Sequence, residues 1–222
     1  MMHRVFFRIA IMATITALAV PIASAVDNNA RGPSSIPARV VADFLHAVIM
    51  AHRSFYTIHI VNPLLQEGIV DVSENWRAKN ALPLPVQFLQ ETSAMAELTN
   101  TGVQYHLISQ WPINKANAPV TEFERRGLEA VQAHPTQPYS SIFVGSSGRR
   151  FGTVYADLAV TRVCIDCHNI HPNSPRSDFN VGDVMGGLVI SFPRPGLGKQ
   201  RPVSAFRSKA PTGRHVSEAT HS

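Results

Sequence analysis

The chain contains two cysteines, and both fall within the pentapeptide Cys164-Ile165-Asp166-Cys167-His168. A C-x-x-C-H sequence is the attachment signature of c-type haem. The two thiols add to the two vinyl groups of haem, and the two-residue spacer sets their separation. The neighbouring histidine then ligates the iron as an axial ligand. The motif therefore predicts one covalent haem c, bound through Cys164 and Cys167, with His168 on the iron.

Two other uses of a C-x-x-C pair fit the sequence less well. A thioredoxin-like redox pair opens a helix within a strand–helix–strand unit, whereas residues 169–183 contain two prolines and read as a loop. A structural zinc site needs four ligands, which usually include a second cysteine pair. The sequence has no further cysteine, so we also expect no disulfide.

The N-terminus has the pattern of a targeting segment. Arg4 and Arg8 precede an uncharged apolar stretch, which is followed by the small residues Ala23-Ser24-Ala25. This pattern predicts a secretory signal peptide over residues 1–25. The alternative is an uncleaved anchor, because residues 9–26 are uncharged over eighteen positions, which is just long enough to span a bilayer. Either way we expect an exported, periplasmic or similar location, where haem c is attached.

The formal charge of +5 comes from the two ends of the chain. Residues 193–222 are rich in Pro, Gly and Ser and carry six basic residues against one acidic residue, which predicts a disordered basic tail. Residues 26–192 carry 12 basic and 14 acidic residues. A nucleic-acid-binding fold carries its basic stripe on the folded part, so we expect no nucleic-acid partner. The tail predicts contact with an anionic membrane surface or an acidic partner.

Hydrophobic periodicity predicts one α+β domain over residues 37–192, preceded by a linker over 26–36. We expect an antiparallel sheet with a long N-terminal helix and flanking helices. The expected helices span residues 37–66, 85–99 and 121–133, and the expected strands span residues 103–110, 141–144, 151–160 and 187–192. Thr121 and Glu124 form a capping-box pattern at the start of the third helix.

Several short motifs, in this order along the chain, resemble the PAS-like monohaem c-type cytochrome domains. This family was first catalogued as a domain of unknown function, and its members are stand-alone exported cytochromes or extracytoplasmic sensor domains. The matching features are Asn114, Asn117 and Pro119 ahead of a helix, the N-x-H-P sequence that begins at Asn169, and the glycine-rich stretch 182–187.

The resemblance covers about residues 37–192 and implies a PAS-like fold with one haem c. It also implies that His168 is the proximal iron ligand. In some members of the family a cysteine of the N-terminal helix is the sixth ligand. This chain has no third cysteine, so its sixth ligand must differ from theirs.

Two histidines of the first helix are candidates for the sixth ligand. Steps of 100° per residue place His52 and His59 on an apolar face with Val41, Leu45 and Val48. They lie about 10.5 Å apart along the helix, so only one can reach the iron. We expect His52, with His59 as the alternative. A methionine, a water molecule or a vacant position remains open.

Other side chains have weaker claims to the site. Met50 falls on the opposite side of the helix. Met185 is a possible sixth ligand, but its position in the sequence gives no reason to favour it. Arg149, Arg150 and Arg162 are candidates to pair with haem propionates, or are solvated surface residues.

These observations predict an exported monohaem cytochrome that transfers electrons to a redox partner protein. The alternative is a haem-based redox or gas sensor that acts through a partner. The sequence shows no acid–base set typical of peroxidases, so we expect no enzyme activity. A haem-dependent catalytic activity is the remaining alternative.

Overall fold

The computed structural model describes residues 35–146 and 148–194. The predicted signal peptide, most of the predicted linker and all but the first two residues of the predicted tail lie outside the described residues. Within the described ranges, none of the helices combines the length and the hydropathy that a membrane-spanning segment requires.

A long helical segment opens the domain, as the sequence predicts. Helix α1 spans Ala38–Phe55 and passes without a break into a π-helix, η1, over Tyr56–Val61. Helix α2 then continues over Asn62–Gln66. Pro63 is the second residue of α2 and has no backbone N–H to donate to the preceding turn of this continuous segment.

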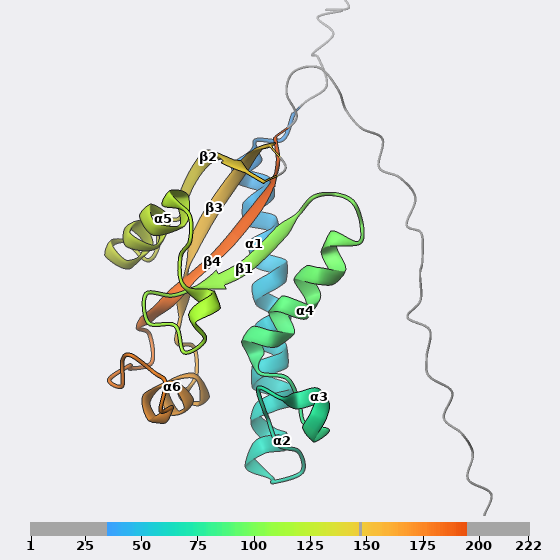
Figure 1. The fold of residues 1–222 in the computed structure, drawn as a ribbon, viewed down its shortest axis with the longest axis vertical. Coiled ribbons are helices and arrows are strands. Elements are labelled where there is room, and N and C mark those ends of the chain that lie inside the picture. The colour runs from blue at the N-terminus through green and yellow to red at the C-terminus, as the bar shows by residue number, and fades with distance from the viewer. Residues whose placement is uncertain (1–34, 147, 195–222) are drawn as a thin grey trace, which may run out of the picture. The chain divides into compact units, whose positions relative to one another are not determined.

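Four antiparallel strands form one sheet, in the order β1-β4-β3-β2 (Figure 1). Their bounds are Gln104–Ile108 for β1, Tyr139–Gly145 for β2, Gly148–Leu158 for β3 and Val184–Pro193 for β4. The remaining helices are α3 over Trp76–Lys79, α4 over Pro85–Glu97, the 3₁₀ helix η2 over Lys115–Asn117, α5 over Glu122–Ala133 and α6 over Arg162–Ile170. The predicted α+β class is confirmed.

Helices cover both faces of the sheet. Helices α1 and α4 pack on one face through a cluster that includes Ala42, Leu89 and Leu188. Helix α5 packs on the other face through Leu128 and Val131. Successive β4 residues alternate between the two clusters, as strand geometry requires, and the centre of β4 is buried on both sides.

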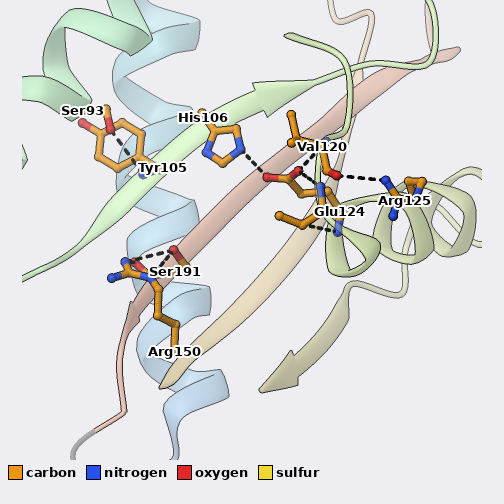
Figure 2. A network of polar contacts seen from close by, with 9 residues as sticks. Ser93, Tyr105, His106, Val120, Glu124, Arg125, Arg150 and Ser191 are labelled. Carbon is orange, nitrogen blue, oxygen red and sulfur yellow. Dashed lines mark hydrogen bonds and ion pairs between the residues drawn. The ribbon is translucent and has the colours of Figure 1, made fainter. Parts of the chain in front are cut away.

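The predicted capping box fixes the start of α5. The Thr121 hydroxyl accepts a hydrogen bond from the Glu124 amide at 3.2 Å, and the Glu124 carboxylate accepts one from the Thr121 amide at 2.9 Å. The same carboxylate also pairs with His106 of β1 at 3.0 Å (Figure 2). Glu124 therefore joins α5 to the edge strand β1.

The face of α1 that the sheet covers differs from the predicted one. Ala42 is fully buried, and Leu45, Ile49 and Met50 are partly buried against the core. Val48, by contrast, is 54% exposed. The helix has apolar residues on two sides, and periodicity alone does not tell which side meets the sheet. The predicted buried stripe through His52 and His59 is therefore wrong, because both histidines are exposed.

Candidate functional site

The C-x-x-C-H motif lies on helix α6, which begins shortly after β3 ends (Figure 1). This helix was not among the predicted elements. Its first turn is fixed by Thr161, whose carbonyl accepts a hydrogen bond from the Cys164 amide at 3.2 Å. Residues three apart lie on the same side of a helix, so α6 presents both thiols in one direction. Among the described residues, neither cysteine takes part in a disulfide.

A third hydrophobic cluster holds α6 against the end of the sheet. Ala159, Phe179 and Met185 are its buried members, and Cys164 packs against them. Asn169 donates a hydrogen bond to the Phe179 carbonyl and accepts one from the Phe179 amide, both at 2.9 Å. These contacts tie the loop after the motif back onto the helix, so the motif has a fixed position.

A cavity of about 530 Å³ opens beside the motif. Cys164, Cys167 and His168 all line it, and the facing wall comes from the α1–α2 segment. Residues 72–75, 84–86, 107–109 and 111–114 supply much of the remaining wall. Its size falls within the range of about 300–1,000 Å³ that is typical of small-molecule and cofactor sites.

The long helical segment presents a single row of residues to this cavity. Arg53, Thr57, Val61 and Leu65 line it, each four residues after the last. In a regular α-helix, steps of four residues drift around the axis by about 40° each. The π-helix over Tyr56–Val61 has a wider turn, which offsets that drift and keeps the row on one side.

An ion pair between Arg53 and Asp157 lies in the cavity wall. The two Nη atoms of Arg53 donate to the two carboxylate oxygens of Asp157, the second at 3.3 Å. The side chains are only 17% and 11% exposed. Burial acts to lower the pKa of Arg53, and the charge and hydrogen bond of Asp157 more than offset it, so the pKa is raised. The Arg53 guanidinium therefore remains charged at neutral pH.

His168 has the properties that an iron ligand requires. Its Nδ1 atom is buried and has no hydrogen-bond partner among the described residues. Burial is the largest influence on its pKa, which is lowered, so the ring is neutral at neutral pH and keeps a free lone pair. Burial also raises the pKa of the Cys167 thiol. The motif and the cavity therefore fit a covalently attached haem.

The structure does not bring the two predicted distal histidines to the cavity. His52 and His59 are exposed, and neither is among the residues that line the wall. Met185 and His171 do line it. His171 follows the motif helix directly, and its Nδ1 accepts a hydrogen bond from the Asn173 amide at 3.1 Å.

The three arginines considered for propionate binding lie outside the cavity wall. Arg150 is 4% exposed and donates to the Ser191 hydroxyl (Figure 2). It also donates to the Gly102 carbonyl. These hydrogen bonds join Arg150 of β3 to β4 and to the residues just before β1, so Arg150 stabilises the sheet. Arg149 and Arg162 are exposed.

Sequence reasoning missed Arg53 and Asp157 as residues of the site. One signal was present: Arg53 is the only Lys, Arg, Asp or Glu between Asp43 and Glu67. A single charged residue in an apolar helix is costly to bury unless a residue of opposite charge pairs with it. Nothing in the sequence pattern pointed to Asp157 as that partner, because it lies 104 residues away.

Comparison with known proteins identifies one family. A family model described as Tll0287-like matches residues 34–193. Among solved structures, the cyanobacterial heme-protein Tll0287 matches with a TM-score of 0.44 and 14% sequence identity. That match covers 72% of this chain and 98% of the solved chain. The comparison with curated proteins gave no match.

Proposed function

The chain belongs to the Tll0287-like family, and from this premise we propose that it is an exported monohaem c-type cytochrome that exchanges electrons with a redox partner protein. The observation that carries the proposal is that Cys164, Cys167 and His168 line one cavity from a single anchored helix. The family also takes its name from a cyanobacterial protein that is described as a heme-protein.

Each residue of the motif has a distinct task in this proposal. Cys164 and Cys167 would hold the haem through thioether bonds, and His168 would bind the iron from the same side. When bound, haem supplies an iron that takes up and releases one electron. Covalent attachment suits an exported protein, since a cofactor lost outside the cytoplasm is not easily replaced.

The opposite wall determines how the site would work. Buried, apolar Val61 excludes water there, while Arg53 and Asp157 compensate each other's charge. A neutral pair changes the local potential less than either charge alone. A closed electron carrier also needs a sixth iron ligand. Outside the motif, the cavity lining includes His171 and Met185, which are side chains of a suitable kind, and both lie beside α6 and not on the α1–α2 wall.

A second candidate function is a haem-based sensor that binds a small gas. It is favoured by the row that α1, η1 and α2 present to the cavity, since Arg53, Thr57, Val61 and Leu65 are not haem-iron ligands of the usual kind. A haem without a protein ligand on that side would leave a position open for an external ligand.

Absorption spectra of the reduced, haem-loaded protein with and without CO separate the two functions. The electron-carrier proposal predicts a low-spin spectrum that CO leaves unchanged, and a high-spin spectrum in Met185→Ala or His171→Ala. Rapid CO binding by the unaltered protein would contradict the closed carrier and favour the sensor. His52→Ala serves as the control, because His52 is exposed and outside the cavity wall.

A further inference from the structure

The side of α1 that faces away from the sheet carries a row of exposed apolar residues. Phe44 is 65% exposed, Val48 54%, Phe55 59% and Ile58 38%, and Ala51 is also exposed. These five residues are called the α1 stripe below. A contiguous apolar surface of this kind marks an interaction site when it occurs on a monomer.

The spacing of the α1 stripe is that of a helix–helix seam. Its members follow one another at intervals of four, three, four and three residues. Over residues 44–55, within α1, this alternation is the a/d pattern of a heptad repeat, in which a second helix packs along the row. The last member, Ile58, lies in η1.

Charge along the α1 stripe favours an identical partner. Arg39 and Asp43 pair with each other at 2.9 Å, and Arg53 points to Asp157 in the cavity wall. The exposed residues beside the stripe are Ala47, His52 and His59. Two copies in contact would therefore bring no like charges of Lys, Arg, Asp or Glu together. Helices that lie on anionic lipid carry Lys and Arg on the polar face, which this side of α1 lacks.

We propose that two copies of this chain dimerise through the α1 stripe. An identical surface on both subunits makes a closed two-fold contact. Ala51 stands at its centre, seven residues from both Phe44 and Ile58. It therefore meets Ala51 of the second copy whether the helices run parallel in register or antiparallel, and its small side chain allows close approach.

The small area of the stripe indicates that the two copies associate weakly. Residues 44–58 span about 22 Å of helix, and a helix is about 10 Å wide, so each copy contributes a few hundred Å². A standard interface buries about 800 Å² per partner. We therefore expect a reversible dimer that forms at high and dissociates at low protein concentration.

The test is sedimentation of the haem-loaded protein over a wide range of concentrations. The unaltered protein should shift from monomer to dimer as concentration rises, and Val48→Glu should remain monomeric. Val144→Glu is the matched control, because Val144 is 81% exposed on β2. A protein that stays monomeric at every concentration, or a dimer that persists in Val48→Glu, would overturn the proposal. Haem content, measured for each variant, keeps this result separate from the proposed function.

A second variant tests the contact directly. Under mild oxidation by diamide, Ala51→Cys should give a covalent dimer, in which the two thiols are oxidised to one disulfide and diamide is reduced. Ala94→Cys on the exposed side of α4 should remain monomeric. Equal crosslinking of both variants would contradict the assigned surface. Flotation of a monomeric protein with lipid vesicles, lost in Val48→Glu, would assign the stripe to a membrane and also overturn the dimer.

Discussion

At the residue scale, the pair formed by Arg53 and Asp157 is the least expected feature of the cavity. It places two opposite charges, 17% and 11% exposed, next to a motif that predicts haem. A buried ion pair adds little stability over an apolar pair, but removal of one partner leaves an uncompensated charge. Replacement of one residue of the pair should therefore destabilise the fold more than replacement of both by apolar residues.

Asp157→Asn should lower the free energy of unfolding by about 3 kcal/mol, because it leaves the Arg53 guanidinium buried without a counter-charge. Urea unfolding of the haem-loaded protein measures this change. Asp166→Asn, at an exposed position of α6, is the control and should have little effect. In the double variant Arg53→Met, Asp157→Leu, most of the lost stability should return. A double variant as unstable as the single one would contradict this account of the pair.

Single residues of the site could be predicted only where a motif defines them. Cys164, Cys167 and His168 follow from a local pattern whose chemistry is known. His52 and His59 were expected at the cavity because helical periodicity places them on an apolar side. Both histidines proved to be exposed, beside the α1 stripe. The choice between two apolar sides depends on the sheet, whose strands are distant in sequence.

At the element scale, two helices are held in place by different means. Helix α6 owes its position to tertiary contacts, mainly the hydrophobic cluster of Ala159, Phe179 and Met185, and this explains why local pattern did not predict it. Helix α5 was predicted because Thr121 and Glu124 mark its start in the sequence. The contact of Glu124 with His106 could not be predicted, because it depends on the placement of β1.

Glu124 makes stability depend on pH in the acid range. Burial acts to raise its pKa, and hydrogen bonds from His106, Thr121 and Val120 more than offset this and lower the pKa to about 2, from the model-compound value of 4.5. A lowered pKa contributes stability above pH 4.5 that is lost as the pH falls toward 2. Glu124→Gln should remove about 3 kcal/mol at pH 7 and much less near pH 2.

Urea unfolding at several pH values between 2 and 7 measures this dependence. Glu129→Gln is the matched control, because Glu129 is exposed on the same helix. The curves of the unaltered protein and of Glu124→Gln should converge as the pH falls. Parallel curves over the whole range would show that the carboxylate does not act through its ionisation.

At the scale of the whole molecule, the cavity connects elements from distant parts of the chain. Helices α1, η1 and α2 form one wall, and α6 and the start of β4 form another. A covalent haem would fill this space and make contacts with both walls. The order of the elements and the α+β class could be predicted from periodicity, while the cavity arises from packing between segments more than a hundred residues apart.

The haem should therefore stabilise the fold as a whole. Cys164→Ser, Cys167→Ser should unfold at a lower melting temperature than the unaltered protein, because the cavity of about 530 Å³ then lacks a ligand that binds only the folded state. Circular dichroism at a wavelength that reports helix measures this difference. An equal melting temperature for the two proteins would mean that haem does not pack inside the domain.

Covalent attachment of haem at the motif is the central claim, and the mass of the denatured protein tests it most directly. For protein produced with a haem c maturation system, we predict a mass that exceeds that of the polypeptide by one haem and that persists in denaturant. The variant Cys164→Ser, Cys167→Ser should have the mass of the polypeptide alone. An unaltered protein without the added mass, or a double variant that retains it, would contradict the account.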